Sequence, residues 1–358
     1  MVGVADDPEE ILNRVGRIGV RVVQIGLGPS PVRPRAIAHR VNLVDRLSQG
    51  SILPASRETA RALRGLNAVV AILRRYPVFI FLVALLLAAA IITPAILTPR
   101  NILQTLRQYS VMGIMALGVT FVVLCGRLDV SVGSLLSLLV VVIVALHDVA
   151  GPMLAMLAGI AIAAVVGAIN GYLIAYLRLN SLITTLGGYA ALQGVANVTS
   201  AGGLQLVKNP ESSWFGVFGR GYILGVPAPD ILFFGLALLG AWVLSQTAVI
   251  FSAYMVSALV TAIAAIVLSS RAMSAQSDSG AGLEITVLSA IFLGGTTLGG
   301  GAGGIGRTVL GVIALAFISN AMILVGLPIQ AQWLASAIVI ILAVWLDAAT
   351  RRGSVFAT

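Results

Sequence analysis

Charge is scarce in this chain of 358 residues, in which Asp, Glu, Lys and Arg together make up only 10%, against about 25% in ordinary soluble domains. Cysteine and histidine are scarcer still, with Cys125, His39 and His147 as their whole complement. A single thiol excludes a disulfide framework within the chain, and so few Cys and His residues exclude a Cys/His metal cluster. The sequence therefore predicts no metal site, and it predicts no cofactor.

Apolar residues, by contrast, make up 59% of the chain, and the mean hydropathy is +1.04. An α-helix rises about 1.5 Å per residue, so about 20 apolar residues cross the roughly 30 Å hydrocarbon core of a bilayer. We therefore predict an all-α, polytopic, multi-pass protein of the cell (inner or plasma) membrane, with about ten transmembrane or half-spanning helices. The predicted spans are residues 77–97, 108–126, 131–147, 150–177, 181–200, 229–247, 249–269, 285–301, 305–325 and 329–349.

The basic residues predict the orientation of these spans. An even number of spans places both termini on one side, which then holds 17 of the 22 Lys and Arg residues, twelve of them in the first 76 positions. Cytoplasmic segments carry such an excess, so we predict cytoplasmic termini and an extracytoplasmic loop at 201–228. The net charge of +9 is concentrated in the same N-terminal segment, so the partner that it indicates is the lipid bilayer and not a nucleic acid. Residues 1–76 are predicted to be a basic cytoplasmic segment, partly disordered or interfacial, and residues 351–358 a cytoplasmic tail.

The segment 285–311 is apolar enough to enter a bilayer, yet nine of its residues are glycine. Glycine disfavours helix and allows backbones to approach closely, and irregular backbone at membrane depth must be surrounded by protein or line a polar cavity. The pattern Gly301-x-Gly303-x-x-Gly306 also fits nucleotide-binding loops, but these need a soluble parallel sheet around them. Here membrane-length runs lie on both sides. We therefore predict a packing or gating role for Gly294, Gly295, Gly299, Gly300, Gly303 and Gly306.

Two polar clusters interrupt the apolar runs. The segment 126–134 (GRLDVSVGS) holds a carboxylate that must be paired, hydrated or capping a helix at membrane depth. Asp129, Ser131 and Ser134 fit an N-terminal helix cap, and contact with a solute on a translocation pathway is the alternative. A second cluster follows Arg178, on one predicted helix. Polar side chains there either hold helices together or line an aqueous path, and the sequence leaves both open. The cluster comprises Asn180, Ser181, Thr184, Thr185, Gln193 and Asn197, of which Asn180, Thr184, Thr185 and Gln193 are the candidates for the pathway.

Four blocks of the sequence, in order, resemble one known family. GRLDVSVGSLLSL (126–138) resembles the "GGIDLSVGS" signature of ABC-type sugar permeases of the ribose, xylose and galactoside class. The segment 179–203 resembles their "NPFIATLGT" block, 269–311 their "EL.AIAAVVLGGTSL.GG.G" block, and 318–347 their closing "NGL.LLGV….Q….G.VI.LAV..D". The resemblance covers nearly all of 77–350.

This resemblance implies that 77–350 is a transmembrane permease domain, the pore-forming subunit of a pentose or hexose importer and not itself an enzyme. It implies a cytoplasmic ABC ATPase, an extracytoplasmic sugar-binding protein and a second permease subunit, in a homodimer or heterodimer, as partners. Arg271 and Glu284 match polar positions of the family's outer-face block. They are therefore candidates for binding-protein docking or for stapling of loops.

The sequence departs from the family after Thr247. There the family carries a cytoplasmic loop, "T..GR…AIGGN..AA..SGI", whose short helix docks into the ATPase, but Thr247 runs directly into Ala248. About two to three dozen family positions are absent, which predicts weakened coupling to ATP hydrolysis. The alternative function is a transport-inactive or degenerate membrane paralogue. An integral-membrane enzyme is disfavoured because the sequence shows no nucleophile–base or metal constellation.

Overall fold

The computed structural model describes residues 90–91, 93–244 and 250–328, and the single residues 330, 331, 334, 337, 338 and 341. The predictions for the basic segment 1–76, for most of the span 77–97 and for the tail 351–358 lie outside the described residues. So does most of the predicted span 329–349.

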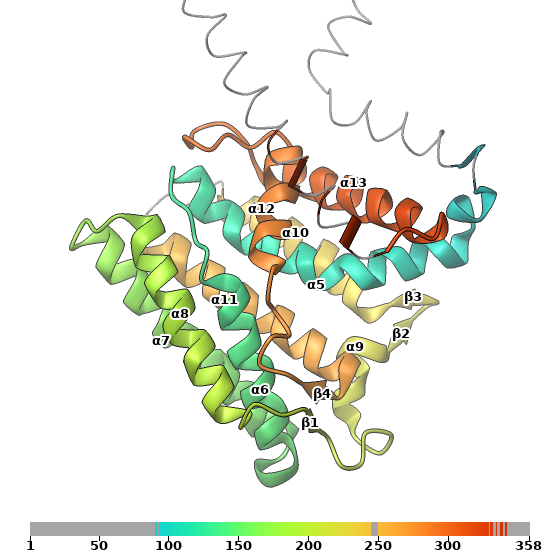
Figure 1. Cartoon of the computed structure of the whole chain (residues 1–358), viewed down its shortest axis with the longest axis horizontal. Coiled ribbons are helices and arrows are strands. Elements are labelled where there is room, and N and C mark those ends of the chain that lie inside the picture. Colours follow the sequence, from blue (N-terminus) through green and yellow to red (C-terminus); the bar gives the residue numbers. More distant parts are fainter. Residues whose placement is uncertain are drawn as a thin grey trace, which may run out of the picture. The chain divides into compact units, whose positions relative to one another are not determined.

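Helices dominate the described residues (Figure 1), as the predicted all-α class requires. Beside them lie two antiparallel pairs of two-residue strands, β1 with β4 and β2 with β3. In chain order the elements are η1 (Pro94–Leu97), α5 (Pro99–Leu124), α6 (Val132–Ala150), α7 (Pro152–Ala175), α8 (Ser181–Thr199), β1 (Gln205–Leu206), η2 (Trp214–Gly216), α9 (Val217–Arg220), β2 (Tyr222–Ile223), β3 (Val226–Pro227), α10 (Ala228–Leu244), α11 (Ile250–Ala272), β4 (Ser274–Ala275), α12 (Leu283–Leu293) and α13 (Ile305–Leu324).

Local sequence signals set several helix starts. Proline fixes φ near its helical value and needs no amide partner at the first position of a helix, and α5 and α7 each begin at a proline. The side chain of Asn180 caps α8, because its Oδ1 accepts hydrogen bonds from the amides of Leu182 (3.0 Å) and Ile183 (3.3 Å). These helix starts are therefore determined by residues that are neighbours in the sequence.

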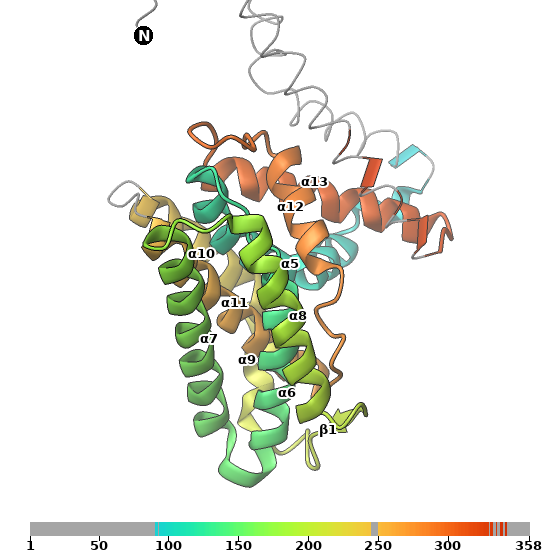
Figure 2. The same ribbon diagram turned by 60° about the vertical axis from the view of Figure 1, so that its left-hand side comes forward.

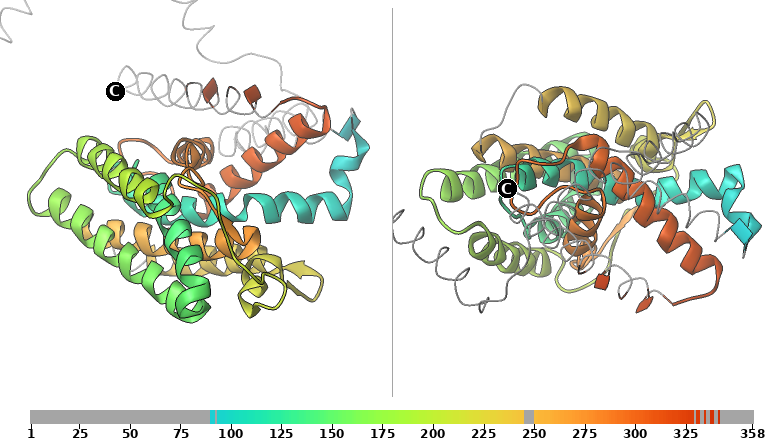
Figure 3. Two further views of the ribbon diagram at one scale, coloured as in Figure 1. Left: turned by 60° about the horizontal axis from the view of Figure 1, so that its bottom comes forward. Right: turned by 90° about the horizontal axis from the view of Figure 1, so that it is seen from above.

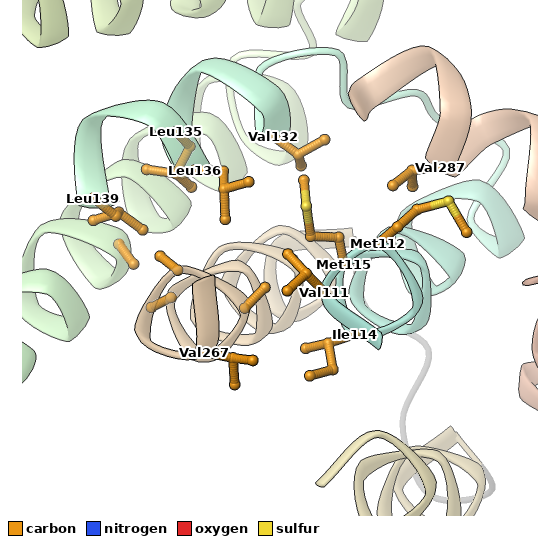
Figure 4. Packing of buried hydrophobic residues seen from close by; sticks show 14 of the residues in the cluster. Val111, Met112, Ile114, Met115, Val132, Leu135, Leu136, Leu139, Val267 and Val287 are labelled. Atoms are coloured by element: carbon orange, nitrogen blue, oxygen red, sulfur yellow. The ribbon is translucent and has the colours of Figure 1, made fainter. Parts of the chain in front are cut away.

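Helix α11 lies at the centre of the described core, where it packs against α5, α6 and α7. Its contact with α7 is close because small residues face it. A Cβ at Gly167 would lie 2.9 Å from the Cβ of Ala258, and one at Gly171 would lie 3.1 Å from the carbonyl oxygen of Phe251. Small residues four apart are a common basis for tight helix packing in membranes. Figure 4 shows the neighbouring aliphatic layer, in which side chains of α5 and α6 meet Val267 of α11 and Val287 of α12.

Two further groupings complete the bundle. α6 packs against both α7 and α8, and Figure 2 shows these three helices together. α13 packs against α5 (Figure 3). Hydrogen bonds join the two helices near both ends, between the hydroxyls of Thr120 and Thr308 (2.7 Å) and from Asn101 Nδ2 to Asn320 Oδ1 (2.8 Å). Since Thr120 lies late in α5 and Thr308 early in α13, the two helices run in opposite directions.

Five described helices are long and apolar enough to cross a membrane, namely α5, α6, α7, α11 and α13. Each overlaps a predicted span, although α5 begins at Pro99, earlier than the predicted start at 108. α8 has 19 residues, but polar side chains lower its hydropathy, and α10 is shorter at 17 residues.

The bounds predicted for the helix at 285–301 are wrong, and only a half-spanning helix lies there. α12 has only 11 residues, which at about 1.5 Å per residue is about half the thickness of the hydrocarbon core. The helix ends at Leu293, and residues 294–304 form turns and bends before α13 begins. Several of these glycines have positive φ, including Gly300 (74°) and Gly303 (146°), which is a conformation that other residues rarely adopt. The apolar composition suggested a span, whereas the glycines set a loop.

Candidate functional site

The turn between α5 and α6 is held by a buried carboxylate. Asp129 is only 3% exposed. Its Oδ1 accepts hydrogen bonds from the amide (3.0 Å) and the hydroxyl (2.6 Å) of Ser131, and its Oδ2 accepts one from the hydroxyl of Ser257 (3.4 Å). Burial raises the pKa of Asp129, while the hydrogen bonds from Ser131 and Ser257 act to lower it. The carboxyl group thus ties the start of α6 to α11.

Helices α7, α8 and α11 make further hydrogen bonds with the same turn. From α8, the hydroxyl of Thr185 accepts a hydrogen bond from the amide of Val130 (3.2 Å), and the hydroxyl of Ser181 accepts one from the amide of Leu128 (3.4 Å). From α11, the phenol of Tyr254 donates to the carbonyl oxygen of Leu128 (3.0 Å). From α7, Asn170 Nδ2 donates to Ser131 Oγ (3.1 Å). We call residues 126–131 with these partners the clamped turn.

The structure brings some of the predicted polar residues together and separates others. Asp129, Ser131 and Thr185 meet at the clamped turn, whereas Gln193 lies further along α8 and donates to the carbonyl oxygen of Ser277 (2.7 Å). Ser134 donates to the Ser131 carbonyl oxygen (3.0 Å) within the first turn of α6. Thr184 likewise bonds locally, to the carbonyl oxygen of Asn180 (2.8 Å). Ser131 is the N-cap residue of α6, but its side chain makes no cap hydrogen bond to the helix. Asp129 acts at this helix start by accepting a hydrogen bond from the amide of Ser131.

Sequence reasoning missed three members of the clamped turn: Asn170, Tyr254 and Ser257. Asn170 is the one strongly polar side chain in the apolar α7, which is itself a signal for a buried contact in a membrane. Tyr254 and Ser257 are three residues apart and so share a face of α11. The residues that they contact lie far away in sequence, so no local sequence pattern predicts these contacts.

Glu284 is buried, at 6% exposure, in the first turn of α12. Its Oε1 accepts a hydrogen bond from the amide of Gly282 (3.3 Å), and its Oε2 faces Gly133 at the start of α6 without a hydrogen-bond partner among the described residues. Nearby, the amide of Gly280 donates to Ser137 Oγ (2.8 Å). The side chain therefore lies inside the bundle, and this position does not fit docking of a partner on the surface.

Arg271, at the end of α11, holds the loops at its own end of the bundle. One of its terminal nitrogens donates to the carbonyl oxygens of Arg107 (3.1 Å) and Gln108 (3.4 Å) in α5. Its own carbonyl oxygen accepts a hydrogen bond from Nε of Arg220 (3.0 Å) in α9. Of the two roles expected for Arg271, these contacts favour stapling.

The six glycines predicted to pack or gate fall into two groups. A Cβ at Gly294 would overlap the carbonyl oxygen of Arg307, because α12 and α13 cross there. A Cβ at Gly300 would lie 2.6 Å from the amide nitrogen of Gly126, beside the clamped turn, and one at Gly303 would lie 2.6 Å from Oγ1 of Thr296. The carbonyl oxygen of Gly299 faces Gly126. A Cβ at Gly295 or Gly306, in contrast, would meet no atom of the described residues within 4 Å, so the space there does not fit a packing role.

Comparisons with known proteins give consistent relatives. A family model described as "Branched-chain amino acid transport system / permease component" matches residues 101–250. The ribose import permease protein of Escherichia coli (strain K12) is 33% identical over 274 residues, which cover 69% of this chain and 85% of that protein. The ribose import permease protein of Bacillus subtilis (strain 168) is 34% identical over 276 residues, covering 70% and 85%. The xylose transport system permease protein of Escherichia coli (strain K12) is 27% identical over 340 residues, covering 71% and 86%. No solved structure matches the chain.

Proposed function

This chain belongs to the family of ABC-type sugar transporter permeases and is a multi-pass inner membrane protein, and on that basis we propose that it forms the translocation pathway of a binding-protein-dependent monosaccharide importer. The observation that carries the proposal is the match to ribose import permeases over 85% of their length. A pentose or a hexose is the proposed substrate, because the names of these relatives refer to ribose and xylose.

The proposed partners are a cytoplasmic ABC ATPase, an extracytoplasmic sugar-binding protein and a second permease subunit. The chain itself would not hydrolyse ATP. Energy would then reach the pathway only through a contact whose equilibrium the ATPase shifts.

We further propose that this contact is impaired. Only residues 245–249 join α10 to α11, which leaves no room between them for a docking helix. The lengths of the alignments support a deletion: 69% of 358 residues is about 247 residues, so about 27 of the 274 positions aligned with the Escherichia coli ribose permease have no counterpart here. The match to the family model also ends at residue 250.

The test is to restore the loop. A family-length loop inserted between Thr247 and Ala248 is expected to increase co-purification with the ATPase, and to increase hydrolysis stimulated by the sugar-binding protein in liposomes. A scrambled loop of equal length is the control. Strong stimulation by the native chain would show that coupling runs through another contact. Absence of ribose or xylose uptake by both chains, despite restored hydrolysis, would favour a different sugar, and absence of both activities would favour a transport-inactive paralogue.

A further inference from the structure

The hairpin β2–β3 exposes an apolar side chain where its backbone favours another residue type. The two strands pair Tyr222 with Pro227 and Ile223 with Val226, so Leu224 and Gly225 form a two-residue turn. Both have positive φ, 52° and 80°. Such turns strongly favour Asn, Asp and Gly, and a bulky residue at positive φ is unusual. Leu224 is nevertheless present, and it is 100% exposed.

Neither the turn geometry nor packing among the described residues accounts for Leu224. Its neighbours are also apolar and exposed, with Tyr222, Ile223 and Val226 each more than a third accessible. We call Tyr222, Ile223, Leu224 and Val226 the hairpin tip. No member of the tip is charged. A partner that covers the hairpin tip would therefore bind it through apolar contacts and not through an ion pair.

Contacts with Arg107 of α5 fix the level of the hairpin along the bundle. Arg107 donates from one terminal nitrogen to the hydroxyl of Tyr222 (3.0 Å) and from the other to the carbonyl oxygen of Gly219 (3.1 Å). Its guanidinium group also lies 5.5 Å from the centre of the Tyr222 ring. Arg107 lies within α5, and the long apolar stretch of that helix begins only after it, at Val111. Arginine and tyrosine with their polar ends toward water are typical of the membrane interface.

The chain that follows the hairpin forms the apolar helix α10. α10 begins at Ala228, directly after β3, and its exposed side chains include Phe234, Leu238 and Leu239. Figure 1 shows the hairpin projecting beside α5 and leading into the helix that follows. The tip is thus continuous with an apolar helix face that a bilayer would cover.

We propose that the hairpin tip inserts into the interfacial region of the lipid bilayer, with Leu224 as its anchor. The predicted orientation makes this the extracytoplasmic leaflet. Insertion explains why leucine occupies this turn position, because the apolar side chain of Leu224 is then buried in the bilayer. The anchor also fixes the position of Arg107 and of the loop between β1 and α10 relative to the membrane surface.

The test measures the surroundings of the tip in liposomes. Leu224→Cys, in a chain in which Cys125→Ser removes the only other thiol, is labelled with a small environment-sensitive fluorophore. Quenching by brominated phosphatidylcholine and quenching by aqueous iodide are then compared. Asn209→Cys, an exposed polar position of the same loop, is the control for a fluorophore that enters the bilayer by itself. At position 224 brominated lipid is expected to remove most of the emission and iodide little, and at 209 the reverse.

Three outcomes would overturn the proposal. Equal iodide quenching at 224 and 209 would place the tip in water. Iodide quenching at 224 that is lost on adding a sugar-binding protein would make the tip a docking surface. Protection of 224 from both quenchers would mean that protein covers it, as a second copy of this chain would.

A second variant isolates Leu224 without opposing the turn. Asn suits a positive φ, so Leu224→Asn preserves the hairpin but removes the anchor. A fluorophore at Val226→Cys is expected to change from lipid quenching to iodide quenching when Leu224→Asn is added. Unchanged lipid quenching would refute the anchoring role of Leu224.

Discussion

Gly311→Ala should weaken the crossing of α12 and α13. A Cβ at this position would overlap the carbonyl oxygen of Ala290 and would lie 2.7 Å from the amide nitrogen of Gly294. Both are backbone atoms, so neither can turn aside as a flexible side chain would. The two helices must therefore move apart to accept one added methyl group.

The magnitude follows from two opposing effects. Overpacking of a well-packed core costs about 1–3 kcal/mol, and contact with backbone indicates the upper end of that range. Alanine is about 1 kcal/mol more favourable than glycine inside a helix. The net loss should be about 2 kcal/mol. For a domain of 150–250 residues each kcal/mol shifts Tm by about 2–4 °C, so Tm should fall by about 4–8 °C.

The same helix offers a matched control. Gly306 lies five residues earlier in α13, and a Cβ there meets no atom of the described residues within 4 Å. Gly306→Ala should therefore leave Tm unchanged or raise it slightly. The measurement is thermal unfolding of the detergent-extracted chain, followed by loss of monodisperse protein in size-exclusion chromatography. Equal Tm values for the two variants would refute the close crossing.

Helix positions were predictable from the sequence wherever the signal was local. The spans 150–177 and 181–200 correspond to α7 and α8, because a proline marks the start of α7 and a polar cap residue marks the start of α8 without help from the rest of the chain. The end of α12 was not predictable in this way. Glycine shows that the backbone is free to adopt unusual conformations, but the contacts of Gly294 and Gly300 with distant segments select which one it adopts.

The candidate site also has a part that was predictable from local sequence and a part that was not. Asp129 and Ser131 are two residues apart, so their pairing was predictable from their spacing. Asn170 and Tyr254 contact the clamped turn from helices far away in sequence. A single sequence does not show which distant residues come into contact. The burial of Glu284 was also hidden, because the non-helical segment before α12 brings it against α6 only in the folded chain.

Two further predictions concern orientation and the clamped turn. A cysteine at position 210, in a chain without Cys125, should react with a membrane-impermeant maleimide from the outside of oriented vesicles, because the basic residues predict an extracytoplasmic loop there; labelling only from the cytoplasmic side would overturn the orientation. Asp129→Asn and Asp129→Leu are similar in size but should differ in stability. Asparagine keeps the acceptor for the amide and hydroxyl of Ser131, and its amide group can donate to Ser257, so Tm in detergent should change little. Leucine leaves these buried donors without an acceptor, at about 1–3 kcal/mol for each unsatisfied group, so Tm should fall clearly. An equal fall for both variants would mean that the negative charge of Asp129, and not its hydrogen bonding, is what the chain requires.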